Sequence, residues 1–299
     1  MAKFSIVKRT VASRIFDIFN IICMILLFLL FVYPFWNQVV LSFNSGTDAA
    51  RGGIFLWPRE WTLSNYEYAF GMGNIWQSIG WSVARVLVGT LSNLFVSGLF
   101  AYIIMLPSFR GRKFLRIVVV LSMYVPIGLI PLYLVFHSLG LLNTFAVYWV
   151  PSLVNGWNIL MISSYMQNHP YALVESARLD GAKELGIYWR IILPISVPVF
   201  AAMAVIVGVG HWNAWFDVMV YNAKGEFDTL QMYLRRILLK ADLVKELMEN
   251  SAVHEELRSL QPMTVRAAVT VIITVPIACI YPFMQKYFIT GVSIGAVKE

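Results

Sequence analysis

The sequence predicts an all-α membrane protein that crosses the bilayer six times. Hydrophobic residues make up 59% of the 299 residues and charged residues only 13%, and the mean hydropathy is +0.70. An average soluble domain contains roughly 25% charged residues. The apolar residues also gather into runs that reach the about 20 helical residues needed to cross a hydrocarbon core. These observations exclude an ordinary soluble domain.

Six apolar segments are long enough to be spans. They cover about residues 15–36, 78–105, 114–136, 142–166, 196–221 and 264–287. The polar stretches between them are short, so we interpret residues 1–299 as one transmembrane domain. The third segment contains Pro126, Gly128 and Pro131, which together predict a kinked helix, either static or serving as a gate hinge.

Basic residues orient the spans. Lysine and arginine collect in short cytoplasmic loops, and here they precede the first span and join the second to the third: Lys3, Lys8, Arg9, Arg14, Arg110, Arg112, Lys113 and Arg116. With an even number of spans, we expect both termini in the cytoplasm. The loop at 168–194 is then cytoplasmic, and the loops at 37–77 and 222–263 are external.

The loop at 168–194 is too polar to span the membrane but has helical spacing. We expect a first short helix over about 171–179. Gly181 then provides a left-handed turn, which glycine adopts without steric cost. A second helix over about 182–192 ends before Pro194, the entry to the fifth span. The loop therefore predicts a helix–turn–helix on the cytoplasmic face.

This loop resembles the EAA loop of binding-protein-dependent ABC importer permeases. The resemblance lies in Glu175-Ser176-Ala177, Asp180-Gly181-Ala182 and the later Ile191, Leu193 and Pro194. It implies the type I ABC importer permease fold and a coupling helix that docks on a cytoplasmic ATPase. The coupling residues would be Glu175, Ser176, Ala177, Asp180, Gly181 and Ala182. Ser176 replaces the alanine of the family motif but is equally small. The alternative is an ordinary amphipathic connector.

A second resemblance concerns the cargo. The segment Tyr281–Phe288, then Gly291 and Gly295–Lys298, is similar to the ending of carbohydrate-uptake permeases of the MalG and LplC kind, closest to the LplC-like branch. It implies import of a carbohydrate, with oligosaccharides containing uronic acids as one class. The implied partners are a related second permease, two copies of an ATPase and an extracytoplasmic solute-binding protein, in a bacterial or archaeal cell membrane. Neither the particular sugar nor its direct contact with this chain follows from the sequence.

Catalytic and cofactor motifs are missing from the sequence. It contains no G-x-x-x-x-G-K-[ST] phosphate loop, so we expect ATP and magnesium to bind partner subunits and this chain to be non-catalytic. Its four histidines lack ligand-like spacing, and Cys23 and Cys279 lie in apolar runs, which predicts no metal site and no disulfide. Two other classes remain open. An ion- or proton-coupled secondary transporter needs acidic relays within the membrane, and a membrane enzyme needs converging reactive groups.

Polar and aromatic residues within the spans are candidates for the substrate pathway. Aromatic faces and hydrogen-bonding groups together suit a sugar, and the candidates are Asn155, Asn158, Trp212, Asn213, Trp215 and Asp217. The alternative is structural: an interfacial aromatic belt, or amides that join helices. Arg85 lies within the second apolar run, where an intramembrane charge is either functional or satisfied by snorkelling or an ion pair.

Overall fold

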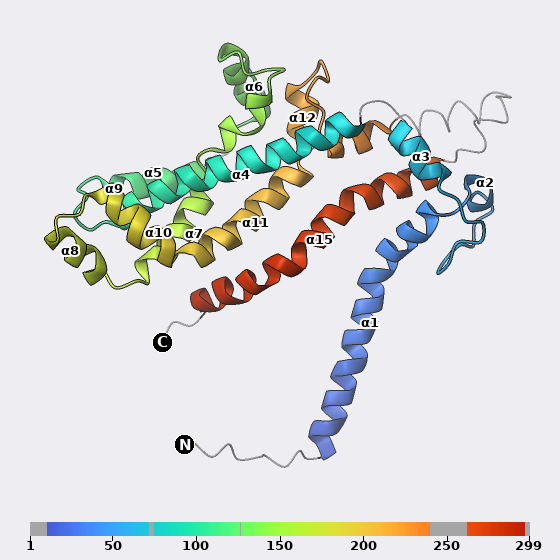
Figure 1. Cartoon of the computed structure of the whole chain (residues 1–299), viewed down its shortest axis with the longest axis horizontal. Coiled ribbons are helices and arrows are strands. Elements are labelled where there is room, and N and C mark those ends of the chain that lie inside the picture. The colour runs from blue at the N-terminus through green and yellow to red at the C-terminus, as the bar shows by residue number, and fades with distance from the viewer. Residues whose placement is uncertain (1–10, 72–74, 126, 238, 240–261, 297–299) are drawn as a thin grey trace. The chain divides into compact units, whose positions relative to one another are not determined.

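The computed structural model describes residues 11–71, 75–125, 127–237, 239 and 262–296. In these residues the fold is nearly all helical (Figure 1), and the one β-type contact is a bridge between Asn44 and Trp61. The predicted all-α fold class is thus confirmed. The chain divides into two compact units, residues 1–71 with 238–272 and residues 72–237 with 273–299.

Three described helices are each long and apolar enough to cross a membrane. They are α1 (Val11–Ser42), α4 (Ile75–Met105) and α15 (Pro262–Ala296). Three bent pairs also qualify. Phe145–Ser152 with Gly156–Gln167 bends by 46°, Glu184–Ile195 with Val197–Asn213 bends by 79°, and the other pair is Arg112–Tyr124 with Leu129–Ser138. Counting each pair as one crossing gives six spans. The bends have local causes, because proline and glycine interrupt helical hydrogen bonding.

Three of the predicted spans are interrupted in the structure. In the third segment, α5 (Arg112–Tyr124) and α6 (Leu129–Ser138) are separate helices rather than one kinked helix. The fourth begins with two short 3-10 helices, η1 (Phe145–Tyr148) and η2 (Val150–Ser152), before α7 (Gly156–Gln167). The fifth predicted span, residues 196–221, consists of α11 (Val197–Asn213) and α12 (Phe216–Tyr221), with a break at Ala214 and Trp215. The 79° bend lies before this span, between the helical stretch Glu184–Ile195 and α11.

The first unit joins the end of α1 to the loop that follows it. Val40 and Leu41 pack with Ala49, Ile54 and Ala267 in a small apolar core. The loop contains α2 (Gly46–Ala49) and α3 (Ser64–Gly71). Burial of these apolar side chains supplies the driving force, and polar contacts fix the path of the loop.

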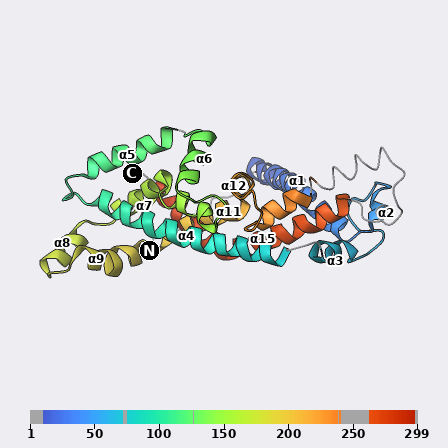
Figure 2. The same ribbon diagram turned by 90° about the horizontal axis from the view of Figure 1, so that it is seen from above.

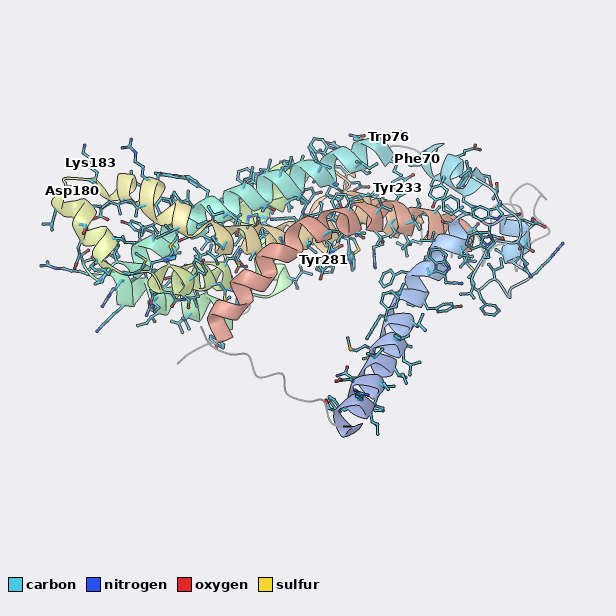
Figure 3. All side chains as sticks on the ribbon, turned by 60° about the horizontal axis from the view of Figure 1, so that its bottom comes forward. Phe70, Trp76, Asp180, Lys183, Tyr233 and Tyr281 are labelled. Atoms are coloured by element: carbon cyan, nitrogen blue, oxygen red, sulfur yellow. The ribbon has the colours of Figure 1, made fainter. Side chains whose placement is uncertain are left out.

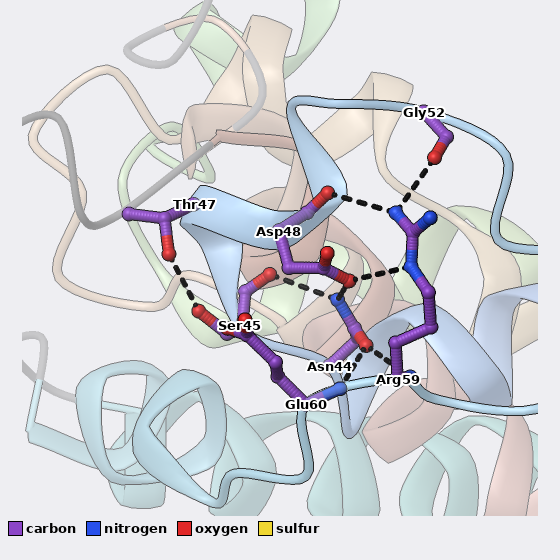
Figure 4. A network of polar contacts seen from close by, with 7 residues as sticks. All are labelled: Asn44, Ser45, Thr47, Asp48, Gly52, Arg59 and Glu60. Carbon is purple, nitrogen blue, oxygen red and sulfur yellow. Dashed lines mark hydrogen bonds and ion pairs between the residues drawn. The ribbon is translucent and has the colours of Figure 1, made fainter.

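A buried polar network organises this loop (Figure 4). The Asn44 side-chain amide donates to Asp48 Oδ2 at 3.0 Å, and Arg59 Nε donates to the same oxygen at 3.0 Å. The backbone N–H groups of Arg59 and Glu60 donate to Asn44 Oδ1 at 2.8 and 3.1 Å. Nearby, the buried Asn65 amide accepts from Thr264 Oγ1 of α15 at 2.8 Å. The two ends of the loop are thereby held together.

In the second unit, α4 packs along both α7 and α11 (Figure 2). Small residues on α4 allow this close approach, as is usual between membrane helices. A Cβ atom on Gly98 would lie 2.7 Å from Phe200 Cζ of α11. Gly208 of α11 also faces α4, but a Cβ there would lie 3.4 Å from Thr90 Oγ1, which is an ordinary contact distance. The close contact between α4 and α11 therefore depends on the absence of a side chain at Gly98. Because α4 packs along both α7 and α11, it is the central helix of this unit.

One end of the second unit contains the helix–turn–helix that the sequence predicts. Its elements are α8 (Ala172–Leu179), α9 (Glu184–Ile187), the π-helix η3 (Tyr188–Ile192) and α10 (Leu193–Ile195). Gly181 has φ +80°, so the expected left-handed turn is confirmed. Val174, Ile187 and Tyr188 are buried in one apolar core with Tyr102 of α4 and Met166 of α7.

Candidate transport pathway and coupling loop

A cavity of about 580 Å³ lies within the second unit, among α4, α6, η1, η2, α7, α11 and α12. This size is in the range of sites that hold small organic ligands. Its wall combines aromatic rings with polar groups. The polar and aromatic lining residues are Arg85, Asn93, Phe136, Tyr148, Ser152, Asn155, Trp157, Asn158, His211, Asp217 and Tyr221. The sequence candidates Asn155, Asn158 and Asp217 are among them.

Arg85 and Asp217 form an ion pair in the cavity wall. Arg85 of α4 is only 3% exposed, whereas the Asp217 side chain is 28% exposed. Both terminal nitrogens of the guanidinium bond the carboxylate, and one of them also donates to Ala214 O at 3.4 Å. The guanidinium also lies 4.8 Å from the ring centre of Tyr148. The ion-pair interpretation of Arg85 is therefore confirmed.

Asp217 has a further partner in its own helix. Its Oδ1 accepts from the backbone N–H of Val218 at 3.0 Å, in the first turn of α12. A carboxylate at a helix start satisfies N–H groups that have no partner within the helix. The break at Ala214 and Trp215 creates this helix start and turns the carboxylate toward Arg85. The fold thus presents a fixed acceptor at the cavity.

The amides of α4 and α7 are largely engaged with each other. Asn158 Nδ2 donates to Asn93 Oδ1 at 2.7 Å, and Asn93 donates to the backbone oxygen of Ser152. Asn155 caps α7, since its Oδ1 accepts from the N–H of Asn158 at 3.1 Å. The bond between Asn158 and Asn93 favours the structural role of joining helices, and the bond of Asn155 is a helix cap. Asn155 and Asn158 both also line the cavity.

His211 occupies a position that the sequence did not single out. It is 8% exposed, and one ring nitrogen lies 3.5 Å from Ser152 Oγ. A Cβ atom on Gly89 would lie 2.6 Å from His211 Cε1. Gly89 is therefore required for the ring to reach the cavity between α4 and η2. The glycine at position 89 was the only signal of this contact available in the sequence, and it does not indicate that His211 is the residue that packs against it.

Trp212, Asn213 and Trp215 lie outside the lining of this cavity. Trp212 Nε1 donates to the backbone oxygen of Ile273 at 3.2 Å, and its ring lines a smaller apolar pocket of about 170 Å³ between α4, α11 and α15. Asn213 Oδ1 accepts from Gln231 at 3.2 Å. The Trp215 ring stacks 3.9 Å from the Arg235 guanidinium. Each has a structural contact in the described part of the chain.

The loop with the EAA-like pattern presents a mixed surface. Glu175, Ser176, Asp180, Gly181 and Ala182 are all exposed, and Figure 3 shows Asp180 at the rim of the unit. Ala177 is buried instead, packing into the chain's own core with Val174. Leu179 is 89% exposed. Leu173 and Leu185 are exposed as well, and several large exposed apolar side chains beside polar groups are typical of a surface that a partner covers.

An ion pair joins the two helices of this loop. Arg178 Nε donates to Glu184 Oε1 at 2.7 Å, and Tyr102 Oη of α4 donates to Glu184 Oε2 at 2.7 Å. Burial raises the pKa of the Glu184 carboxyl, but the hydrogen bonds from Arg178 and Tyr102 outweigh it and leave this pKa below its usual value. The bond to Glu184 also raises the pKa of Arg178.

Known proteins show where this architecture occurs. Residues 94–294 match the family of binding-protein-dependent transport system inner membrane components. The chain belongs to this family. It is thus a membrane permease subunit of an ABC transport system, as the EAA-like loop indicated, and the matched region includes α4 from Leu94 onward together with the whole of α8.

Individual relatives match over nearly the whole chain. Protein LplC of Bacillus subtilis (strain 168) is 36% identical, and the match covers 100% of both chains. The polygalacturonan/rhamnogalacturonan transport system permease protein YtcP of the same strain is 32% identical over 96% of this chain and 99% of that protein. Among solved structures, a bacterial ABC transporter involved in the import of the acidic polysaccharide alginate superimposes with a TM-score of 0.83. It has 27% identity and covers 96% of this chain and 100% of that chain.

Proposed function

We propose that this chain is one of two permease subunits of an importer for oligosaccharides, coupled by α8 to ATP hydrolysis in cytoplasmic partner subunits. The observation that carries the proposal is the arrangement within the second unit. A polar cavity at one place and an exposed helix–turn–helix at another are both built on α4. A movement imposed on the loop is therefore able to change the cavity.

The cavity suits a sugar in its chemistry. Asp217 accepts hydrogen bonds from hydroxyl groups, and the rings of Tyr148, Trp157 and Tyr221 offer apolar faces. Relatives handle polygalacturonan or rhamnogalacturonan, and a similar transporter imports alginate. We therefore favour oligosaccharides, including those that contain uronic acids, as the cargo. Within this wall, Arg85 is 3% exposed and is paired with Asp217, whose side chain is 28% exposed, so the carboxylate is the more accessible group of the pair.

The orientation follows from basic residues around the loop. Arg178 Nη2 donates to Ser108 Oγ at 3.2 Å, which brings α8 to the connection between α4 and α5. That connection also contains Arg110, and Arg112 is the first residue of α5. Because short basic loops remain in the cytoplasm, we place this end of the second unit, and both termini, on the cytoplasmic side. The ATPase subunits then meet α8, and a solute-binding protein delivers the sugar from the opposite side.

The proposed cycle is alternating access. ATP binding closes the two ATPase subunits, which shifts the docked α8 and turns the cavity from inward-facing to outward-facing; hydrolysis and release return it. Glu175 would contribute a charged contact that fixes the docking register rather than supplying most of the affinity. Gly181 would keep the left-handed turn that separates α8 from α9.

Reconstituted complexes in liposomes test this proposal. We expect Gly181→Ala, which strains a residue at φ +80°, and Glu175→Ala to lose sugar uptake while ATP hydrolysis and sugar binding to the solute-binding protein persist. Lys183→Gln in the same loop is the matched control. Normal ATP-coupled uptake by both variants would contradict the coupling role of the loop. Uptake that requires an ion gradient and does not depend on ATP would instead favour a secondary transporter.

A further inference from the structure

Arg178 and Glu184 connect the coupling loop to the rest of the second unit. The Arg178 guanidinium reaches three groups: Glu184 Oε1 at 2.7 Å, Tyr171 Oη at 2.7 Å and Ser108 Oγ at 3.2 Å. The second oxygen of Glu184 accepts from Tyr102 of α4. One ion pair therefore contacts α8, α9, α4 and the connection that follows α4.

The energetic weight of this pair is small. The side chains of Arg178 and Glu184 are 28% and 49% exposed, and ion pairs in contact with water contribute about 0–1 kcal/mol. Stability of the loop comes instead from the buried core beneath it, where Val174, Ile187 and Tyr188 pack against α4 and α7. Removing the pair should therefore leave folding and assembly intact.

The pair contributes more to the orientation of the loop than to its stability. Arginine presents its donors in a rigid planar fork, so three simultaneous partners fix its direction as well as its distance. Apolar contacts have no preferred direction, so the core beneath the loop specifies the orientation of α8 and α9 on α4 less sharply than directional hydrogen bonds do. The ion pair and the Tyr102 hydroxyl supply those directional bonds.

We propose that Arg178 and Glu184 are positioning residues that make the coupling loop and α4 move as one body. The proposal rests on the coupling role proposed above for α8. The rigid element is α4 itself, since Tyr102 and the cavity residue Arg85 lie on the same helix. At about 1.5 Å per residue they are separated by about 25 Å along its axis. A displacement of α8 thereby reaches the cavity wall.

The test is a double-variant cycle in the reconstituted complex. Arg178→Gln, Glu184→Gln and the double variant are compared for assembly, for ATP hydrolysis stimulated by the sugar-loaded binding protein, and for sugar imported per ATP. We expect normal assembly and about a fivefold fall in sugar per ATP for each single variant, the low end of typical coupling between sites. The double variant should lose no more than either single variant, because both remove one shared contact.

Two further variants separate positioning from simple packing. Tyr102→Phe keeps the buried ring and removes only the hydroxyl that donates to Glu184, so we expect a smaller fall in the same direction. Lys183 is an exposed basic residue beside Glu184 (Figure 3), and Lys183→Gln should behave as wild type. Wild-type sugar per ATP in Arg178→Gln and Glu184→Gln, or additive losses in the double variant, would overturn the inference.

The same experiment distinguishes this inference from the proposed function. If Gly181→Ala loses coupling while Arg178→Gln keeps it, the loop couples without this ion pair and only the inference fails. If Gly181→Ala, Glu175→Ala and Arg178→Gln all retain normal uptake per ATP, the coupling role of the loop itself fails.

Discussion

Arg85 of α4 and Asp217 of α12 are 132 residues apart in the sequence and form an ion pair in the wall of the cavity. Their exposures differ, since Arg85 is 3% exposed and the Asp217 side chain is 28% exposed. Loss of Asp217 leaves a buried cation without its partner, whereas loss of Arg85 leaves a carboxylate that water in the cavity still reaches. Removing Asp217 should therefore destabilise the fold more than removing Arg85.

The first prediction follows from this inequality. We expect Asp217→Ala to lower the free energy of unfolding by about 3–5 kcal/mol, the usual cost of an uncompensated buried charge. Arg85→Met should cost less. Thermal unfolding of the purified complex in nanodiscs measures both. The double variant should be more stable than Asp217→Ala, because it no longer buries a lone charge; a double variant as unstable as the sum of both would contradict the argument.

The second prediction concerns the hydrogen bond between Asn158 and Asn93, whose donor and acceptor lie 2.7 Å apart. We expect Asn158→Ala to destabilise the complex by about 0.6–2 kcal/mol, the range for polar contacts between membrane helices, with no change in the apparent KM for sugar. Asn93→Ala combined with Asn158→Ala should cost little more than either alone. A raised KM with unchanged stability would assign Asn158 to the sugar instead.

The fold was readable from the sequence where one kind of signal dominates. Long apolar runs predict α1, α4 and α15, because crossing the hydrocarbon core requires continuous helix. The pattern around Gly181 predicts the helix–turn–helix, since glycine there has a steric reason. The breaks in the other spans were less accessible. Pro126 and Pro131 indicate an interruption, but whether it kinks a helix or separates two depends on packing that sequence alone does not contain.

The site was harder to predict than the fold. Asp217 and Arg85 were each recognised as unusual, but their pairing depends on the break at Ala214 and Trp215, which turns the carboxylate toward α4. Trp212 was proposed for the pathway because aromatic rings suit sugars, yet a rotation around the helix of 100° per residue decides which wall a side chain joins. Periodicity shows which residues share one side of a helix, but it does not show which other element that side contacts.

The third prediction is a pH dependence in the loop of the first unit that lies between α1 and α3. The hydrogen bond from Asn44 lowers the pKa of Asp48, burial opposes this, and the bond and charge of Arg59 lower it further, so that the pKa is below its usual value. A carboxyl with a depressed folded pKa stabilises the fold above its unfolded pKa of about 3.9. This stabilisation is lost as the pH falls through the folded pKa.

Hydrogen exchange in this loop provides the measurement. The N–H of Ser45 bonds Glu60 O at 2.8 Å, and the N–H of Thr62 bonds Phe43 O at 2.9 Å, so both amides report on the closed loop. After correction for intrinsic rates, their protection should be constant above about pH 5 and should fall as the pH is lowered from about 5 to about 2. Asp48→Asn should remove this pH dependence. A wild-type profile that stays flat over this interval would show that the network does not hold the loop.

The last prediction compares two glycines on the same helix. A Cβ atom on Gly89 would lie 2.6 Å from His211 Cε1, whereas a Cβ on Gly80 meets nothing within 4 Å. Gly89→Ala therefore pushes the His211 ring away from Ser152, and we expect it to cost about 1–3 kcal/mol of stability, as overpacking in a close-packed interior does. Gly80→Ala should be neutral or stabilising by up to about 1 kcal/mol, because alanine has a higher helix propensity than glycine.

Unfolding of both variants in nanodiscs distinguishes a specific clash from a general sensitivity of α4. If Gly80→Ala is as harmful as Gly89→Ala, the close approach of His211 is not the reason for glycine at position 89. The further variant Gly89→Ala/His211→Ala supplies the missing space, and it should recover part of the loss if the clash is the cause.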